Sequence, residues 1–587
     1  MCGILGLSEG DEPLVRKAAS TISYRGPDAS GVYTDGEVTL GHNRLSVIDL
    51  DPRSNQPFFD PEGKVGLVYN GEIYNYRSIK TELERTGKYV FRTNSDTEVV
   101  LYAYKEWKEK VVNHLEGMYA FAVYDRERQQ IILCTDQAAI KPLVYANIQG
   151  VLAFGSEVKA VVAMLREKNI SIHVDQDALS LYYAVGYIPA PATLYQEVRR
   201  LRPRTWGVFD LKTHTFTETQ YALPLVSAQS QEGMRALIEK SVEQHLVADV
   251  PVGLFFSGGT DSSLIAAVLK KFGVQLEAFC VEIADRPEDA QYAQKISIEL
   301  GMSLHNFTFG PKEFDDIYES IVSRLDEPLA DSSLFPTCFV AQKAAEKVKV
   351  VLSGEGGDEF FFGYPRSRYL QKLHGAPLDS EAGLFERIFF LLPIFKGKNK
   401  LFERIFILMR KPVAFYLLTM SPTKSRMSFL MWKGAKRTLA ALAQNADALD
   451  ADTYLPYDLL RKTDIATMYA SLEGRVPLLA PEVISAARAT PQHLGTGELK
   501  PLLKKILASY IPADLVYRKK TGFGLRARSF FSQSAHVRAD LENAKSYLSS
   551  RGYLPIDVPR EEDMLAHYPN LCWQLISLYH VLRNAGI

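Results

Sequence analysis

A short apolar run ending in a turn rich in serine and glycine constrains the fold of this chain most. Residues 252–256, VGLFF, are compatible with a β-strand and too few for a helix, and Ser257-Gly258-Gly259 ends them. Residues 264–271, LIAAVLKK, then read as a helix. A strand, a glycine turn and a helix N-terminus form an anion site, because glycine lets the backbone approach a phosphate and the helix dipole favours its charge.

The polar side chains of this turn suit a nucleotide. Asp261 can hold a divalent metal on phosphates, and hydroxyl donors come from Ser257, Thr260, Ser262 and Ser263. The loop is not a Walker loop, because no Gly-Lys-Ser/Thr ends it. Residues 257–263, SGGTDSS, resemble the pyrophosphate loop of N-type ATP pyrophosphatases, which cleave ATP between its α- and β-phosphates to adenylate a substrate. The alternative is a plain glycine turn beside a serine-rich helix cap.

Length and charge exclude several classes of protein. A chain of 587 residues predicts two or three domains, and 47% hydrophobic residues allow a large core. The balance of 68 basic and 69 acidic residues provides no basic field for nucleic acid. Five cysteines without a CxxC pair favour a reducing compartment and no structural zinc site. The sequence shows neither a signal peptide nor a spanning apolar run, so we expect a cytoplasmic protein.

The N-terminus carries a candidate nucleophile. Removal of the initiator methionine would expose Cys2, whose free α-amine, with a pKa of about 7.7–8, can take the thiol proton. Alone, Cys2 would be read as a reactive terminal residue. Further blocks follow in order: YRGPD at 24–28, GHNRLS at 41–46, YNGEIYN at 69–75 and SDTE at 95–98. Together with MCGI they resemble the glutaminase domain of class II amidotransferases, which are Ntn hydrolases with an αββα sandwich.

The resemblance assigns roles to these blocks. Attack of a thiolate on the glutamine amide creates an oxyanion, which the Asn70 side chain and the Gly71 N–H would stabilise. Arg44 would bind the α-carboxylate, and Glu72 and Asp96 the α-ammonium. The implied glutamine-binding set is Arg44, Leu45, Asn70, Gly71, Glu72 and Asp96. Without the resemblance, Asn70-Gly71 between apolar runs would be typical of a hairpin turn.

Two loops depart from the family pattern. Residues 135–139, TDQAA, stand where the family usually has Arg-Asp and a later glycine, and Pro203-Arg204 replaces a Pro-Gly turn. We expect these changes to affect local loops and domain contacts rather than chemistry. The polar stretch 213–231 predicts a boundary between a glutaminase domain at 2–212 and a synthetase domain at 232–587, with a helical insertion around 373–450.

The second half alternates strands and helices. Strands are expected at 250–256, 276–283 and 348–352, with helices at 234–247 and 290–300, which predicts a doubly wound parallel sheet. The loop at 353–359, SGEGGDE, resembles the second loop of asparagine synthetases. Asp261 and Asp358 would then meet at one mouth and share Mg²⁺ on ATP.

The same resemblance assigns the remaining residues of this half. Glu355 would assist formation of the acyl-adenylate and accept a proton from ammonia. Lys500 would stabilise the negative charge that develops on the phosphates. The implied ATP-binding set is Phe255, Ser257, Gly258, Gly259, Asp261, Ser262, Val281, Ser353 and Gly354. Blocks at 326–328, 331–333, 471–477 and 518–523 also match. At 478–480 the chain has Leu-Leu-Ala where the family usually has Phe-Leu-Asp, which weakens the case for aspartate as acceptor.

One internal repeat falls outside these patterns. LFERIF occurs at 384–389 and again at 401–406. The repeat can form two amphipathic helices over the acceptor site. The alternative is a basic-aromatic surface at 384–430 that contacts a membrane or a glycan.

The whole chain resembles the glutamine-hydrolysing asparagine synthetases. The implied reaction uses glutamine, ATP and Mg²⁺ to convert aspartate to asparagine through an acyl-adenylate. One alternative keeps this chemistry with a uronic acid or a natural-product carboxylate as acceptor. Another is a non-catalytic scaffold, which the retained site residues oppose. No nucleic-acid partner is expected, and a homodimer is left open.

Overall fold

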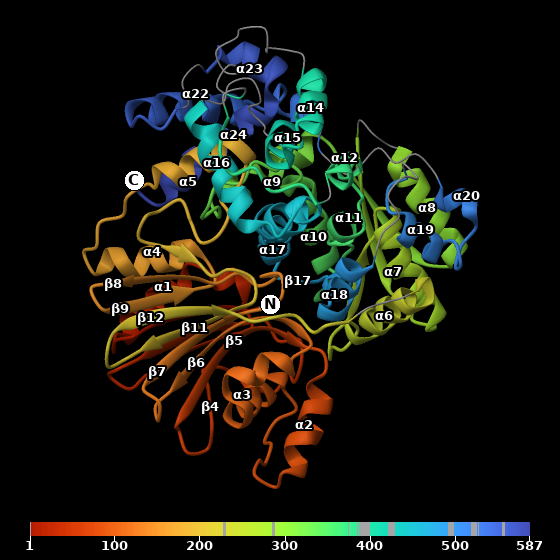
Figure 1. Cartoon of the computed structure of the whole chain (residues 1–587). Coiled ribbons are helices and arrows are strands. Elements are labelled where there is room, and N and C mark those ends of the chain that lie inside the picture. Colours follow the sequence, from red (N-terminus) through yellow and green to blue (C-terminus); the bar gives the residue numbers. More distant parts are fainter. Residues whose placement is uncertain are drawn as a thin grey trace.

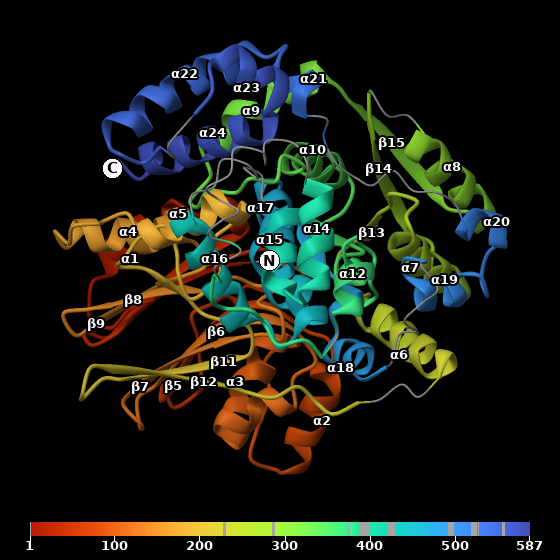
Figure 2. The ribbon, with the colours of Figure 1, turned by 45° about the horizontal axis from the view of Figure 1, so that its top comes forward.

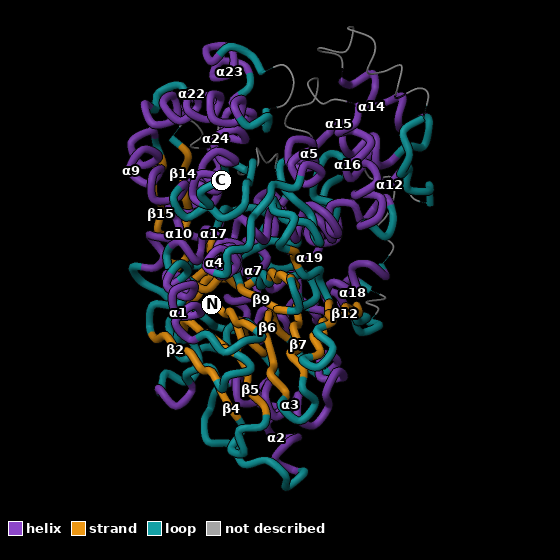
Figure 3. The backbone as a smooth tube through the Cα atoms, turned by 90° about the vertical axis from the view of Figure 1, so that its left-hand side faces the viewer, coloured by secondary structure: helices purple, strands orange, loops and turns teal. Residues whose placement is uncertain are grey.

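The protein is a mixed α/β chain of two parts (Figure 1). The computed structural model describes residues 2–226, 230–284, 288–373, 375–383, 386, 399–420, 429–490, 498–517, 525, 527–554 and 558–587. In the side view, the strands of the N-terminal part lie together below and most helices of the C-terminal part lie above (Figure 3). No helix within these described ranges is long and apolar enough to cross a membrane.

The N-terminal part is a sandwich of two six-stranded antiparallel sheets. The first has the order β10-β8-β9-β1-β3-β2, with β1 Gly3–Leu7, β2 Ala29–Thr34, β3 Thr39–Arg44, β8 Val144–Ile148, β9 Val151–Gly155 and β10 Arg199–Arg200. The second has the order β12-β11-β7-β6-β5-β4, with β4 Phe58–Phe59, β5 Val65–Ile73, β6 Gly117–Asp125, β7 Gln130–Thr135, β11 Thr205–Asp210 and β12 Thr215–Gln220.

Helices cover both outer faces of the sandwich (Figure 1). Helices α1 (Glu12–Ser20) and α4 (Val158–Glu167) pack on the first sheet, and α2 (Tyr76–Arg85) and α3 (Asp96–Trp107) lie on the side of the second. This is the expected αββα arrangement. Strand β12 lies inside the stretch expected to be a linker, so the second sheet extends past residue 212.

Strand β5 shows how the sandwich places a polar side chain inside. Leu67 and Tyr69 pack toward α3, whereas Val68 packs between the two sheets. Because side chains alternate along a strand, Asn70 shares the inward face of Val68. The strand continues through Asn70 and Gly71 in unbroken register with β6, so the hairpin-turn interpretation of these residues is wrong.

The C-terminal part contains a five-stranded parallel sheet with the order β15-β14-β13-β16-β17. Its strands are β13 Val252–Phe255, β14 Glu277–Ile283, β15 Ser303–Phe309, β16 Val350–Leu352 and β17 Glu473–Arg475. The order reverses at β13, which lies between β14 and β16. Ligands of such sheets bind at the carboxyl ends of the strands at this switch point. Both glycine-rich loops follow these strands.

Helices lie on both sides of this sheet (Figure 2). One side carries α6 (Gln231–Gln244), α7 (Thr260–Lys271), α8 (Glu288–Leu300) and α19 (Pro501–Leu507). The other carries α10 (Leu334–Ala345) and α17 (Leu460–Tyr469). The doubly wound prediction is confirmed.

Further helices extend the C-terminal part. They are α9 Pro311–Val322, α11 Gly357–Phe360, α12 Ser367–Lys372, α14 Asn399–Leu408, α15 Pro412–Met420, α16 Phe429–Leu442, α18 Pro481–Ala489, α20 Ala513–Val516, α21 Ala527–Phe531, α22 Ala535–Ser550, α23 Glu561–His567 and α24 Pro569–Asn584. The second LFERIF copy lies in α14, where Phe406 is buried against Trp432. The first copy, apart from Glu386, and the block at 518–523 lie outside the described residues.

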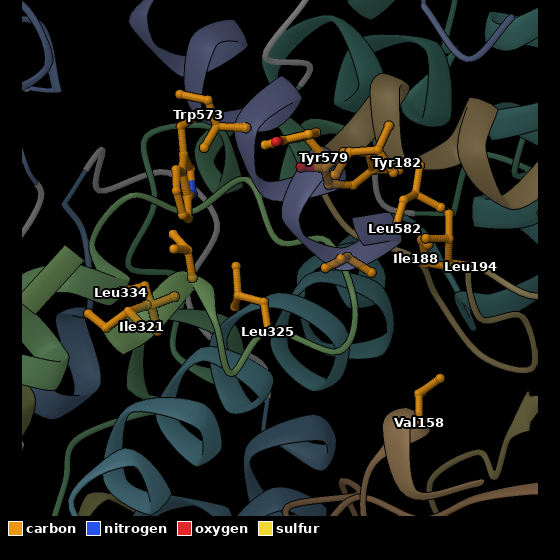
Figure 4. Close-up of a cluster of buried hydrophobic side chains, with 14 of the residues drawn as sticks. Val158, Tyr182, Ile188, Leu194, Ile321, Leu325, Leu334, Trp573, Tyr579 and Leu582 are labelled. Atoms are coloured by element: carbon orange, nitrogen blue, oxygen red, sulfur yellow. The ribbon is translucent and has the colours of Figure 1, made fainter. Parts of the chain in front are cut away.

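The two parts share a hydrophobic core. Val158, Tyr182 and Leu194 from the first part belong to one buried cluster with Leu334 and Trp573 from the second (Figure 4). The Tyr182 hydroxyl donates to the Gln574 carbonyl at 2.8 Å, and the Gln574 side-chain amide donates back to the Tyr182 carbonyl at 2.6 Å. This joint core fixes the parts against each other and places the N-terminus between them (Figure 1).

Candidate active sites

The first candidate site is built around Cys2 at the start of β1. The Cys2 backbone N–H donates to Asn70 Oδ1 at 2.8 Å, and the Cys2 thiol lies 3.9 Å from the Leu45 carbonyl. Burial raises the pKa of the Cys2 thiol. The Cys2 carbonyl accepts from Arg25 Nε at 3.1 Å, which anchors the residue on both sides.

Asn70 presents an unused donor in this site. Its Oδ1 atom is bonded to Cys2, and its Nδ2 atom is buried without a hydrogen-bond partner among the described residues. A buried donor without a protein partner is rare in folded proteins, and it leaves Nδ2 able to donate to a substrate atom. Gly71 beside it allows close packing, because a Cβ there would lie 2.2 Å from the Met118 carbonyl oxygen. The arrangement can therefore offer donors to an oxyanion next to a thiol.

Two buried carboxylates lie in the same site. Asp96 begins α3 and accepts from the Tyr69 hydroxyl at 2.8 Å and the Ile73 N–H at 3.2 Å. Burial raises the pKa of Asp96 to about 6. Burial and the charge of Asp96 raise the pKa of Glu72 well above its ordinary value. A cation such as an α-ammonium would stabilise both charges.

Arg44, at the end of β3, is anchored by the loop that follows. Its guanidinium donates to the carbonyls of Ile48 at 3.2 Å and Asp51 at 3.1 Å, and to Asn55 Oδ1 at 2.8 Å. It also donates to the Asp49 carbonyl. Arg44 directly precedes Leu45, whose carbonyl lies 3.9 Å from the Cys2 thiol, so the two residues belong to one site.

The second candidate site is a cavity of about 740 Å³ at the switch point of the parallel sheet. Every residue of the expected ATP set lines it, together with Glu355, Asp358 and Lys500. Gly258 has φ +63°, and a Cβ there would lie 2.7 Å from the Ala293 Cα. Only glycine therefore fits that turn without displacing α8.

The two loops pack directly on each other. A Cβ at Gly354 would lie 2.9 Å from the Asp261 Cβ, and one at Gly357 would lie 2.4 Å from Asp261 Oδ1. The glycines of the second loop thus make room for the acidic residue of the first. This packing was not foreseen from the local motifs.

Lys500 joins both acidic residues. Its ammonium contacts Asp261 Oδ2 and lies 2.7 Å from Asp358 Oδ1. Burial alone would lower the pKa of Lys500, but these two carboxylates raise it above its ordinary value. Gly363, which sequence reasoning missed, closes the cluster, since a Cβ there would lie 1.8 Å from Asp358 Oδ1 and 2.2 Å from Lys500 Cε.

The donor set fits a magnesium–nucleotide complex. Mg²⁺ in such sites takes one or two carboxylates and completes its shell with phosphates and water. Asp261 and Asp358 supply such carboxylates at the mouth of a phosphate-binding loop. Within the described ranges there is no cluster of three or more His, Cys, Asp or Glu residues that could hold a metal without the nucleotide.

Glu355 lines the cavity, and one of its two carboxylate oxygens has no hydrogen-bond partner among the described residues. Its Oε1 atom accepts from Thr463 Oγ1 at 2.9 Å, and its Oε2 atom is buried with no partner in the described part of the chain. Lys462 also lines the cavity, with its ammonium 3.1 Å from Ser333 Oγ and 3.2 Å from Asp331 Oδ2. Sequence reasoning missed Thr463 and Lys462, which lie just before the block at 471–477.

The two loops that depart from the family pattern show backbone strain and a contact between the two parts. Ala139 and Arg204 take φ values of +51° and +58°, a conformation in which glycine is free of strain. Gln137 Nε2 donates to the Leu479 carbonyl at 2.9 Å and so joins the two parts.

Ala480 lies at the junction of the two parts. It lines a small cavity there with Tyr74, Gln137 and His245. Its expected place near the acceptor stays a prediction.

Comparison with known proteins identifies both parts. Residues 1–222 match the family described as "Glutamine amidotransferase domain", and residues 233–571 match "Asparagine synthase". This chain belongs to the glutamine-hydrolysing asparagine synthetase family. It is a carbon–nitrogen ligase of the asparagine synthetase type, and the family uses ATP.

Similar proteins cover most of the chain. It is 31% identical over 560 residues to asparagine synthetase [glutamine-hydrolyzing] 1 of Bacillus subtilis, covering 90% of this chain and 87% of that one. It is 32% identical over 583 residues to a putative asparagine synthetase of Mycobacterium tuberculosis H37Rv, covering 90% and 88%. A solved "allosteric regulatory enzyme of purine biosynthesis" matches with a TM-score of 0.30 and 16% identity, covering 52% and 80%.

Proposed function

We propose that this enzyme hydrolyses glutamine at Cys2 and uses the ammonia to amidate aspartate, which it first activates with ATP. The observation that carries the proposal is a pair of buried polar atoms, Asn70 Nδ2 and Glu355 Oε2, that have no hydrogen-bond partner in the described ranges. The first lies beside the candidate thiol and the second belongs to a residue lining the cavity with both glycine loops. We assign the glutaminase domain to 2–220, because β12 belongs to its second sheet, and the synthetase domain to 232–587.

Removal of Met1 would leave Cys2 with a free α-amine. In the first half-reaction the thiol proton passes to this amine, and the Cys2 thiolate attacks the glutamine amide carbon. Asn70 Nδ2 and the Gly71 N–H would stabilise the oxyanion, and ammonia leaves as the thioester forms. Glu72 and Asp96 would hold the substrate ammonium, and Arg44 its carboxylate. Water then releases glutamate and regenerates the thiol.

In the second half-reaction, the aspartate side-chain carboxylate attacks the α-phosphate of ATP and pyrophosphate leaves. The N-terminus of α7 and the hydroxyls of Ser257 and Ser262 would bind the phosphates. Asp261 and Asp358 would hold Mg²⁺, which neutralises phosphate charge when bound. Ammonia attacks the acyl-adenylate, its proton passes to Glu355, and AMP leaves with the amide formed. Lys500 would balance charge on the phosphates.

The alternative acceptors, a uronic acid or a natural-product carboxylate, rest on the Ala480 substitution and the LFERIF repeat. Ala480 lies at the junction of the two parts. The first copy of the LFERIF repeat, apart from Glu386, lies outside the described residues.

The deciding experiment measures AMP and pyrophosphate release with ATP, Mg²⁺ and ammonium chloride, with and without aspartate. Ammonium bypasses the glutaminase site, so the result isolates the acceptor. We expect aspartate-dependent release with formation of asparagine. A Cys2→Ala variant should keep this activity and lose the glutamine-driven reaction. Release without any response to aspartate would refute the acceptor, and glutamine-driven amidation by Cys2→Ala would refute the nucleophile.

A further inference from the structure

Arg475, the last residue of β17, reaches across the junction of the two parts. It is fully buried, and its Nη2 atom donates to Glu72 Oε2 at 3.0 Å. Its Nε atom donates to Glu473 Oε1 at 2.8 Å, and Nη1 donates to the carbonyls of His245 and Val247 at 2.8 and 2.7 Å. The C-terminal part therefore holds the guanidinium rigidly while it binds one carboxylate of the N-terminal part.

The backbone of Arg475 touches the other site. Strand β17 pairs with β16 in parallel, with Arg475 opposite Leu352. The Ser353 N–H donates to the Arg475 carbonyl at 2.8 Å. Ser353 opens the second loop and lines the ATP cavity. One residue thus makes a hydrogen bond to each candidate site.

We propose that Arg475 is a positioning residue that completes the glutamine site from the synthetase side and links that site to the ATP loop at Ser353. The proposal rests on the function proposed above, in which Glu72 binds the α-ammonium of glutamine.

The charge of Arg475 affects the protonation of Glu72. Glu72 faces Asp96 from α3, Glu473 and Arg475 from β17, Tyr69 on its own strand and Tyr74 just after that strand. The charge of the amino terminus also acts on it. Burial and the acidic neighbours favour a protonated Glu72, whereas Arg475 favours the ionised form. A protonated Glu72 attracts no ammonium. Loss of the Arg475 charge should therefore weaken glutamine binding without touching the nucleophile.

The backbone bond adds coupling between the sites. A ligand that moves Ser353 moves the carbonyl of Arg475 and hence the strand that holds its guanidinium. If ATP changes the affinity for glutamine through this path, glutamine must change the affinity for ATP by the same factor.

The test compares Arg475→Met and Arg475→Lys in the full-length enzyme. Glutaminase kcat and KM would be measured from about pH 6 to about pH 8, with and without ATP, beside ammonia-driven AMP release. We expect Arg475→Met to raise the KM for glutamine at least about tenfold, and this KM should fall as pH rises and Glu72 ionises. The effect of ATP on this KM should be lost. Arg475→Lys keeps the positive charge, so its KM for glutamine should lie between the values of the wild type and Arg475→Met. This KM should also depend less on pH than that of Arg475→Met.

Arg200→Met is the matched control. Arg200 is also a buried arginine that crosses the junction, where it pairs with Glu327, and it touches neither site. It should lower the thermal midpoint and leave the KM for glutamine unchanged. Equal losses of glutamine-driven and ammonia-driven rates in Arg475→Met and Arg200→Met would overturn the proposal, since both residues would then be merely structural.

Two further outcomes distinguish failure of this proposal from failure of the proposed function. A wild-type KM for glutamine that is the same with and without ATP would overturn the link to Ser353. Absence of glutaminase activity in the wild type would instead refute the proposed function. If Arg475→Met does not fold, Arg475→Lys decides. Lysine cannot make all the hydrogen bonds of the planar guanidinium, so an unchanged KM for glutamine and an unchanged ATP effect in Arg475→Lys would contradict the proposal.

Discussion

The ammonium of Lys500 lies 2.7 Å from Asp358 Oδ1 inside the ATP cavity. Lys500 precedes α19, whereas Asp358 follows β16, so chain segments far apart in the sequence meet here. The same ammonium contacts Asp261. Lys500 thus balances the charges of the buried Asp261 and the partly exposed Asp358.

Replacing Lys500 should damage the synthetase reaction alone. Lys500→Met leaves Asp261 and Asp358 without their shared cation and removes a charge proposed to act on the phosphates. We expect ammonia-driven AMP release to fall by about 10²–10³-fold, as for loss of one preset electrostatic donor. Glutaminase activity should stay within about twofold. Lys504→Met, which removes another cavity lysine bound to Glu498, is the control and should have a smaller effect. A comparable loss in both variants would contradict the specific role.

Removing the unused donor of Asn70 should lower glutamine turnover. Asn70→Ala takes away Nδ2 and also the acceptor of the Cys2 N–H. Loss of one oxyanion donor predicts a fall in glutaminase kcat of about 10²–10³-fold. Steady-state glutamate release measures this, and ammonia-driven amidation serves as the internal control. An Asn70→Ala enzyme with wild-type kcat would exclude the oxyanion role.

The raised pKa of Asp96 predicts a pH dependence. Burial brings the pKa of Asp96 to about 6, and the ionised form is the one that binds an ammonium. As pH falls through about 6, the ionised fraction and kcat/KM for glutamine should fall by about tenfold per unit. Asp96→Asn should have a low and flatter profile. A wild-type profile that stays flat to about pH 5 would contradict this assignment.

Gly363 should tolerate no side chain. Gly363→Ala places a Cβ 1.8 Å from Asp358 Oδ1 and 2.2 Å from Lys500 Cε, so both groups must move. We expect ammonia-driven AMP release to fall by about tenfold or more, because small misplacements of reacting groups are costly. Gly434→Ala in α16 is the control, since no atom lies within 4 Å of its added Cβ. It should keep full activity, and equal losses in both variants would argue against a specific role for Gly363.

Relief of backbone strain should stabilise the N-terminal part. Ala139 has φ +51°, which costs about 1–2 kcal/mol for a residue with a Cβ. Glycine removes this cost but adds about 0.4–1 kcal/mol of unfolded-state entropy. Ala139→Gly should therefore raise the free energy of unfolding by about 0.5 kcal/mol, which urea titration would detect. Ala138→Gly, at the buried neighbour, should lower it, and a lowered value for Ala139→Gly would show that the strain is absent.

Local patterns predicted much of the fold. The strand at β13, the glycine turn and α7 follow from a short apolar run, two glycines and a helical run, all within a few residues. The αββα arrangement followed from the resemblance of the N-terminal blocks. Strand β12 was missed because its polar, exposed sequence lacks the alternation that marks a half-buried strand.

The sequence by itself determined which residues are candidates for the chemistry, because Cys2, Asn70 and the two glycine loops belong to short motifs that can be read locally. Only the tertiary structure decided what surrounds them. The pairing of Arg475 with Glu72 depends on how the two parts pack, and the position of Lys500 between two carboxylates depends on how distant segments of the C-terminal part meet. Such contacts join residues hundreds of positions apart, and they form because a shared apolar core fixes one part against the other.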